Sequence, residues 1–341
     1  MASSNFSAIA LPPSLPPSDI IVMVTPFGDP PSVRLSLFGT LLLLFTAAVA
    51  GNALLCSVVC LERRLRTPMC TFIASMALTD IVQVASSVPR IMANLLGDGG
   101  AAGGGGGPRG GGVGLVSVAE CTAQMFLMHV SVRAQAFLLA LMSVDRYLAV
   151  AFPLRYRSLV TNGAALRASA AAAAAACALT CPNVALLVGL DYCRARVLAA
   201  VYCSFYSVAF TSCGDVGAQR RYGYATLALA TALPACAVAL AYALILLECR
   251  KAGLRRGQRK ALRTCVTHLL AVGAFFASVF FSFASNISFL AGVGAEVSYC
   301  LQGLHCIVPA LVNPVIYGLG TAEIRRGCVK RFRRRVADGG R

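Results

Sequence analysis

The stretch Leu138-Leu-Ala-Leu-Met-Ser-Val-Asp-Arg-Tyr-Leu-Ala-Val150 decides the fold, because an apolar helix runs directly into an acid, a base and an aromatic residue. A charged pair is costly at membrane depth, so Asp145 and Arg146 are expected at the inner boundary of a membrane-spanning helix, where they have a function. The simpler interpretation is a pair that anchors the helix at the interface. Pro153-Leu-Arg-Tyr156 follows a few residues later.

Composition points to the same class of protein. Of the 341 residues, 58% are hydrophobic and 13% are charged, about half the charged fraction of a soluble chain. The net charge of +17 would suit a nucleic-acid-binding protein, but the basic residues lie between apolar stretches rather than on one soluble face. We therefore predict a membrane protein that does not bind nucleic acid.

Seven apolar stretches are each near the roughly 20 residues that cross the hydrocarbon core, or somewhat longer with tilt. They cover residues 35–61, 68–96, 118–150, 164–190, 222–248, 261–290 and 297–319. We predict an all-α fold, a bundle of seven transmembrane helices. Residues 1–33 would form an N-terminal tail, 34–320 the membrane domain, and 321–341 a short amphipathic helix with a basic tail.

Lys and Arg predict the orientation of the bundle. They are concentrated in the loops after the first, third and fifth stretches and after the seventh, which would be cytoplasmic. The N-terminus would then be extracellular, and Asn5 in Asn5-Phe6-Ser7 is a candidate glycosylation site. We expect a multi-pass protein of the plasma membrane.

Two further segments have distinctive compositions. Residues 97–114 are almost all Gly and Ala, and we assign them no structure. Residues 321–332 predict a helix on the inner membrane leaflet, with basic residues on anionic lipid and Ile324, Val329 and Phe332 in the interface. Cys328 is either palmitoylated or a plain interfacial cysteine.

Short motifs carry a resemblance to a known family. They are Gly51-Asn52, Leu65-Arg-Thr-Pro-Met69, Met142-Ser-Val-Asp-Arg-Tyr-Leu-Ala149, Lys260-Ala-Leu-Arg-Thr-Cys-Val-Thr-His-Leu269 and Asn313-Pro-Val-Ile-Tyr317. Together they resemble the vertebrate odorant (olfactory) receptors, which are rhodopsin-like G-protein-coupled receptors. The resemblance covers about residues 51–333.

This resemblance implies a receptor that binds a small organic odorant and activates a stimulatory G protein, raising cyclic AMP. The sequence has no catalytic constellation, metal-type cysteine pair or phosphate-binding loop, so we expect neither an enzyme nor a cofactor or metal. Two alternatives remain: a rhodopsin-like receptor for a peptide or lipid, and a seven-helix channel or transporter.

The resemblance also implies roles for polar residues in the spans. Arg146 would pair with Asp145 at rest and meet the G protein on activation; the alternative for Tyr242 is an interfacial anchor. The residues expected to act in coupling and activation are Asp145, Arg146, Tyr147, Tyr242, His268, Asn313, Pro314 and Tyr317. Asn52 and Asp80 would be polar residues of the helix core. Gln135 stands where the family often has an acid, which puts a sodium ion near Asp80 in doubt.

Four cysteines are expected on the outer side. Cys193, Cys203 and Cys213 are ten residues apart in the loop after the fourth span, and Cys121 begins the third span. The resemblance implies Cys121–Cys203 and Cys193–Cys213 disulfides. The sequence alone leaves three pairings open.

We expect the ligand in the outer half of the bundle. Counting residues along the third span places four side chains at the depth expected for a ligand: Met128, His129, Val132 and Arg133. On the sixth span, four apolar residues recur on one face, a pattern that ordinary helix packing would also explain: Phe276, Val279, Phe280 and Phe283. A buried Arg133 near mid-membrane needs a polar cavity or a partner. We therefore expect an anionic odorant; alternatively, Arg133 bonds backbone carbonyls or Ser and Asn side chains of the fourth and fifth spans.

Overall fold

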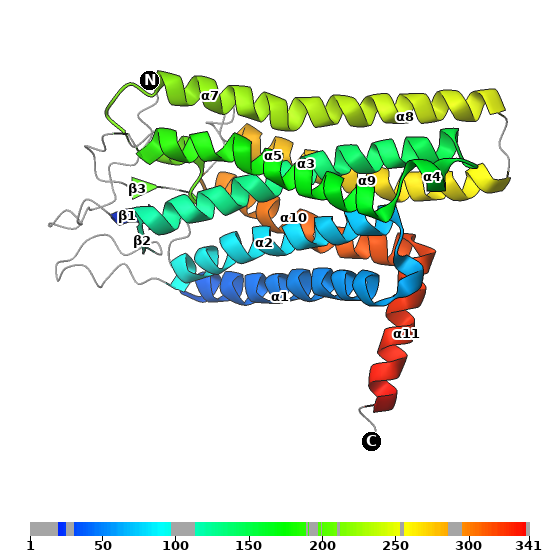
Figure 1. The fold of residues 1–341 in the computed structure, drawn as a ribbon. Helices are drawn as coiled ribbons and strands as arrows, with labels where there is room; N and C mark the ends of the chain where they lie inside the picture. Colours follow the sequence, from blue (N-terminus) through cyan, green and yellow to red (C-terminus); the bar gives the residue numbers. More distant parts are fainter. Residues whose placement is uncertain are drawn as a thin grey trace.

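The fold is a bundle of long helices that run roughly along one axis, with a small sheet at one end and helix α11 projecting from the other (Figure 1). The computed structural model describes residues 20–24, 31–96, 113–188, 190, 197–198, 200–209, 212–252, 256–285 and 295–338. We refer to the two ends of the bundle as the sheet end and the α11 end.

Seven long helical segments build the bundle. They are α1 (Pro31–Leu61), α2 (Pro68–Leu96), α3 (Val118–Ala151), α5 (Asn162–Val188), α7 (Gly217–Leu227) continued by η3 (Ala228–Ala232) and α8 (Leu233–Ala252), α9 (Arg256–Ser285) and α10 (Ala295–Gly320). Shorter helices connect them: η2 (Arg63–Leu65), α4 (Tyr156–Leu159) and α6 (Phe205–Ala209).

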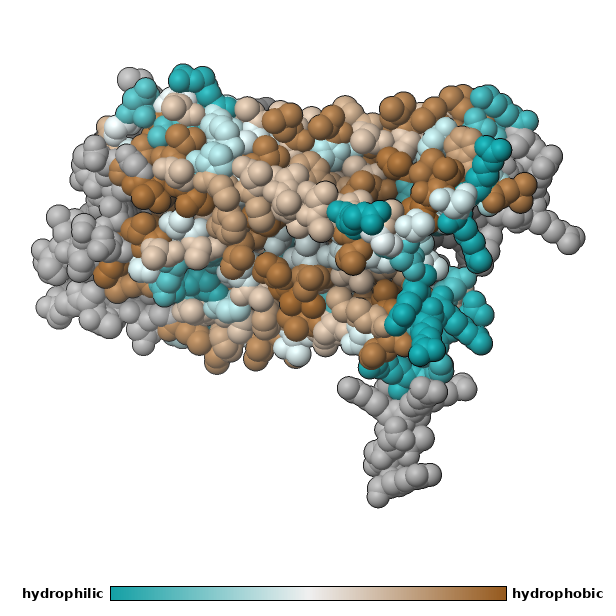
Figure 2. Space-filling view, viewed as in Figure 1, coloured by the Kyte–Doolittle hydropathy of each residue, from teal (hydrophilic) through white to brown (hydrophobic). Residues whose placement is uncertain are grey.

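Length and composition confirm the predicted fold class. Six of these segments are long and apolar enough to cross a membrane, and the seventh, α9, has a shorter apolar stretch, Cys265–Phe280. Apolar side chains cover the middle of the molecule, and hydrophilic ones gather where α11 meets the bundle (Figure 2).

Helix ends differ from the predicted ones for local reasons. The first helix begins at Pro31 rather than at residue 35, and a proline is tolerated in the first turn because its missing N–H has no helical partner there. The fifth span begins at Gly217 rather than at residue 222, and it contains the π-helical turn Ala228–Ala232. Such turns often occur at functional sites.

A three-stranded sheet at the sheet end was not predicted. Its strands are β1 (Ile20–Val24), β2 (Val113–Ser117) and β3 (Val197–Leu198), in the order β2-β1-β3, with β1 antiparallel to β2 and parallel to β3. The prediction of no structure over 97–114 is therefore wrong for its last two residues, while 97–112 lie outside the described residues. At Gly114 a Cβ would lie 2.0 Å from Oδ1 of Asn94, so a larger residue there would require the Asn94 side chain to move.

Helix α11 (Ala322–Asp338) is longer than predicted and is attached to the bundle. Nζ of Lys330 lies 2.9 Å from Glu62, and Arg331 donates to the backbone oxygen of Ser57. The interfacial position expected for Ile324 is wrong, because this side chain is fully buried against the bundle. Val329 is 48% exposed, and the side chain of Phe332 lies outside the described residues.

Candidate functional site

A cavity of about 450 Å³ lies among the helices toward the sheet end. Its walls come from α3, α5, α7, η3, α9 and α10, and the segment 202–205 contributes as well. The lining residues are Met128, His129, Val132, Arg133, Ala136, Asn183, Tyr202, Ser204, Phe205, Gly223, Tyr224, Leu227, Ala230, Thr231, Phe275, Val279, Ser282, Phe283 and His305.

Six of the eight residues predicted for the ligand line this cavity: Met128, His129, Val132, Arg133, Val279 and Phe283. The other two do not, which corrects the prediction. Phe276 packs into the core below the cavity, and Phe280 is 65% exposed on the outer surface. The residues of α9 that line the cavity are Phe275, Val279, Ser282 and Phe283. Hydrophobic spacing cannot separate the two faces, because a lipid-facing side is as apolar as a cavity-facing one.

Arg133 is buried in the cavity wall and is held by two neighbouring helices. Its guanidinium donates to Oγ1 of Thr180 on α5 at 2.6 Å and to Oγ1 of Thr226 on α7 at 3.2 Å. Each hydroxyl in turn donates to a backbone oxygen of its own helix. The predicted alternative, bonding to the fourth and fifth spans, is therefore right about the helices, although the partners are threonines.

Two histidines line the cavity, His129 on α3 and His305 on α10. Nδ1 of His129 lies 2.8 Å from the backbone oxygen of Met125; a carbonyl only accepts, so this nitrogen carries the proton and Nε2 is an acceptor when the ring is neutral. Ser278 donates to the backbone of Phe275, so Nδ1 of His305 donates to its hydroxyl at 3.3 Å. The Nε2 atom of each ring is then an acceptor when the ring is neutral.

Asn183 is a lining residue that the sequence analysis missed. It is 2% exposed and lies on α5 three residues after Thr180. The signal available was a polar residue inside a span, which is a functional candidate by default. The alanine-rich surroundings gave no apolar face from which to infer its direction.

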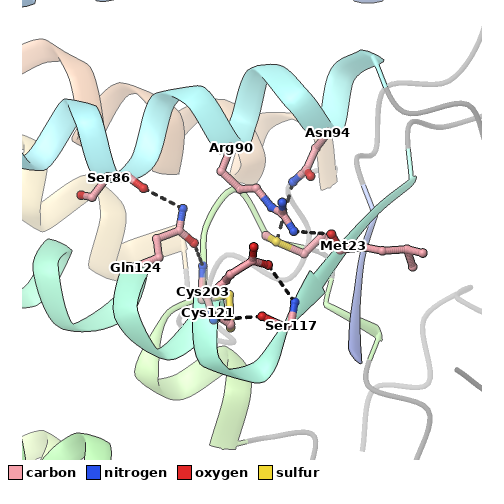
Figure 3. Close-up of a disulfide and its surroundings, with 10 residues drawn as sticks. Met23, Ser86, Arg90, Asn94, Ser117, Cys121, Gln124 and Cys203 are labelled. Carbon is pink, nitrogen blue, oxygen red and sulfur yellow. Dashed lines mark hydrogen bonds between the residues drawn. A yellow bond between two sulfur atoms is a disulfide. The ribbon is translucent and has the colours of Figure 1, made fainter. Parts of the chain in front are cut away.

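A disulfide fastens the loop that covers the cavity (Figure 3). Cys121 at the start of α3 is bonded to Cys203, as the resemblance implied. Next to it, Gln124 donates to the backbone of Ser86 and accepts from the backbone N–H of Cys203. Cys213 is also disulfide-bonded; its predicted partner Cys193 lies outside the described residues, as does Asn5.

The helix that leads into this disulfide is fixed by a capping box. The side chain of Ser117 accepts from the N–H of Glu120, and the Glu120 carboxylate accepts from the N–H of Ser117. Arg90 donates to the backbone of Leu115 in β2, and Asn94 contacts Met23 in β1 (Figure 3). The sheet is therefore joined to both α2 and α3.

A buried polar cluster occupies the middle of the bundle. Asp80 accepts from Nε2 of Gln135 at 3.0 Å and from Nδ2 of Asn313 at 2.9 Å. Asn52 donates to the backbone of Ala310 at 2.7 Å, joining α1 to α10. The amide of Gln135 therefore fills the place beside Asp80, and the described residues include no cluster of three metal-ligating side chains.

At the α11 end the acid and base of the opening motif bind each other. Nε of Arg146 lies 3.1 Å from Oδ2 of Asp145, and the hydroxyl of Tyr156 donates to Oδ1 at 2.6 Å. Burial and the adjacent carboxylate raise the pKa of Tyr156, so its hydroxyl keeps the donated proton. Tyr147 is half-buried and packs edge-to-face on Phe152.

The helices around this pair are joined by Tyr242 and His268. The Tyr242 hydroxyl donates to the backbone oxygen of Cys265 and lies 2.8 Å from Nδ1 of His268, which links α8 to α9. Tyr317 is buried on α10, and its hydroxyl has no hydrogen-bond partner among the described residues. Pro314 lies inside α10, against Gly51 of α1.

Comparison with known proteins is consistent with this arrangement. The family model described as Olfactory receptor matches residues 41–335. Olfactory receptor 52D1 of Homo sapiens is 30% identical over 287 residues, which cover 84% of this chain and 86% of that protein. Olfactory receptor 52N2 of Homo sapiens is 27% identical over 290 residues, 84% of this chain and 85% of that protein.

Proposed function

This chain belongs to the olfactory receptor family of G-protein-coupled receptors, and from that premise we propose that it binds a small organic odorant and activates a stimulatory G protein. The observation that carries the proposal is the cavity between α3, α5, α7, α9 and α10, together with the closed Asp145–Arg146 pair at the opposite end of the same helices. The ligand site and the coupling site are thus on shared helices.

The sheet end faces the outside of the cell in this proposal, and the protein is inserted in the plasma membrane. The Cys121–Cys203 disulfide at that end supports this orientation, because disulfides persist on the oxidising side. Arg63, Arg64 and the basic face of α11 lie at the other end, as expected for cytoplasmic loops. Lys330 and Arg331 contact the bundle, and Arg325 and Arg326 are exposed toward anionic lipid.

The cavity favours a small, largely apolar ligand with a polar group at one point. Its volume of about 450 Å³ is within the usual range for small-molecule sites, which are mostly apolar with a few placed polar groups. Met128, Val132, Phe275 and Val279 provide the apolar walls.

Arg133 favours an anionic group such as a carboxylate or sulfonate. Its partners include the hydroxyls of Thr180 and Thr226, which are neutral and do not cancel its positive charge. A guanidinium binds carboxylates with charge-assisted hydrogen bonds, which are stronger than neutral ones. We therefore expect the receptor to respond to acids at lower concentrations than to their esters.

Coupling requires the α11 end to open. Outward movement of α9 would break the bond between Tyr242 and His268 and expose Arg146 to the G protein. Pro314 allows α10 to bend, because it removes one backbone donor. The hydroxyl of Tyr317, which has no partner among the described residues, would gain one in the open arrangement.

The test is a panel of odorants applied to cells that express the receptor with a cyclic AMP reporter. We expect concentration-dependent cyclic AMP for some acids in cells that contain a stimulatory G protein, and no signal in cells that lack it. A ligand-dependent ionic current in cells without the G protein would contradict the proposal and favour a channel.

A further inference from the structure

The amide of Asn183 is a polar group that the cavity wall does not satisfy. The side chain is 2% exposed and lines the cavity, and its Oδ1 makes no hydrogen bond with the described residues. Buried polar atoms are nearly always paired, because desolvation without a compensating bond is costly. The oxygen and nitrogen of an amide are assigned from their hydrogen bonds, so this side chain of the cavity wall can turn its oxygen toward the cavity, where a ligand supplies the missing donor.

The position of Asn183 relative to Arg133 sets a distance between two recognition points. Arg133 is bonded to Thr180, and Asn183 is three residues further along α5. At about 1.5 Å rise per residue, the amide is about 4.5 Å closer to the sheet end. His129, four residues before Arg133 on α3, lies at a similar level.

The two points have opposite hydrogen-bonding character. A guanidinium has five donors and no acceptor, whereas Oδ1 of an asparagine only accepts. A ligand that satisfies both must place an acceptor at Arg133 and a donor at Asn183. An apolar acid without a second polar group satisfies only the first.

We propose that Asn183 determines specificity by accepting a hydrogen bond from a hydroxyl or N–H of the odorant, placed about 4.5 Å along the helix axis toward the sheet end from the acceptor that meets Arg133. A carboxylate with a hydroxyl group on the third carbon has this spacing. This inference rests on the proposed ligand cavity and adds a second requirement to it.

The experiment compares three probes that differ at one position: hexanoic acid, 3-hydroxyhexanoic acid and 3-methoxyhexanoic acid. Binding is measured by the melting temperature of the purified receptor, and response by cyclic AMP. We expect the hydroxy acid to act at about tenfold lower concentration than the other two, the effect of one net hydrogen bond. The methoxy compound lacks the proton, so it gains nothing over hexanoic acid.

The decisive variant is Asn183→Leu, which keeps a similar volume and removes the amide. We expect the preference for the hydroxy acid to fall to less than about twofold, because the acceptor is gone. Val279→Ala is the matched control: it alters an apolar part of the same cavity, so it should weaken all three probes alike and keep their ratio.

Melting of the unliganded receptor distinguishes a ligand contact from a structural one. If Asn183 serves a ligand, the unliganded Asn183→Leu receptor melts at the same or a higher temperature, because an unsatisfied buried polar group has been removed. A drop of several degrees would show that the amide holds the fold and would overturn the inference.

The possible failures separate this inference from the proposed function. Equal binding of the hydroxy acid and hexanoic acid to the unmodified receptor would overturn the role of Asn183 and leave the proposed function intact. Absence of binding by all three probes to a correctly folded receptor would overturn both the anionic ligand class and this inference.

Discussion

Buried polar side chains at the two ends of the bundle differ in whether the protein itself supplies their hydrogen-bond partners. At the α11 end, Asp145 is bound by Arg146 and Tyr156, and Tyr242 is bound to His268. In the wall of the cavity toward the sheet end, Oδ1 of Asn183 has no hydrogen-bond partner among the described residues. The Asp145–Arg146 pair is closed by the protein's own side chains, whereas in our proposal a ligand supplies the partner in the cavity.

This difference explains why the motifs gather at one end. A side chain whose partner is another residue of the same chain can be identified by a fixed pair of residue types, such as Asp145-Arg146 with Tyr156. A side chain whose partner is a ligand can be any residue that suits that ligand. Nε2 of His268 and the hydroxyls of Tyr317 and Thr321 are exceptions at the α11 end, where they have no hydrogen-bond partner among the described residues. We expect the Tyr317 hydroxyl to gain a partner when the bundle opens.

The variant with the largest expected effect tests whether the sheet end needs the Cys121–Cys203 disulfide. Cys121→Ser should prevent delivery to the cell surface, because loss of an extracytoplasmic disulfide typically costs about 2–5 kcal/mol. Surface antibody labelling of a tagged receptor measures this. Cys236→Ser, at an exposed free cysteine of α8, is the control and should reach the surface normally.

The next effect tests the closed end. Arg146→Ala should abolish cyclic AMP signalling and leave surface expression largely intact, because we assign this residue to the G-protein interface rather than to folding. Arg157→Ala, at an exposed arginine of α4 between α3 and α5, is the control and should signal normally. Normal signalling by Arg146→Ala would remove the coupling assignment.

A variant with a smaller expected effect tests whether Arg133 binds an anionic group of the ligand. Arg133→Gln should reduce the response to acids by about 10- to 100-fold, since a hydrogen bond to a charged group is worth about 1.5–3 kcal/mol. The response to the matching methyl esters should change far less. Full sensitivity to acids in the variant, or equal responses to acid and ester in the unmodified receptor, would contradict the anionic assignment.

The smallest effect concerns the second bond on Asp145. Tyr156→Phe removes one hydrogen bond from the closed arrangement, a net contribution of about 0.5–1.5 kcal/mol. We expect ligand-independent cyclic AMP to rise by about two- to tenfold at equal surface density. Ser158→Ala removes an exposed hydroxyl of the same helix that donates to the backbone of Arg155 rather than to Asp145, so its basal signal should stay unchanged.

Much of the fold could be predicted, because membrane spans depend on length and composition alone. The seven spans and the Arg146–Asp145 pairing agree with the sequence analysis. The sheet was missed because its strands are short, come from three distant segments, and one of them ends a glycine-rich run. Pairing between such segments depends on tertiary structure, which local patterns do not encode.

For the candidate site, the sequence predicted the level of the residues along the helices but not which side of each helix faces the cavity. Counting along α3 placed Met128, His129, Val132 and Arg133 at the right level, because the helical rise is fixed. Phe280 was assigned to the cavity although it faces outward, and Asn183 was not assigned at all. Which side of a span faces a cavity depends on the neighbouring helices, and apolar periodicity does not report that when the other side faces lipid.

The central place of β1 in the sheet has a consequence for the order of assembly during synthesis. Ile20–Val24 is made first, yet its parallel neighbour Val197–Leu198 follows about 170 residues later, a delay on the order of 10 to 35 seconds at usual translation rates. The N-terminal segment must therefore remain unpaired on that side while α1, α2, α3 and α5 are inserted. A chain that stalls before residue 197 would leave an open strand edge, which a chaperone could recognise as the mark of an unfinished receptor.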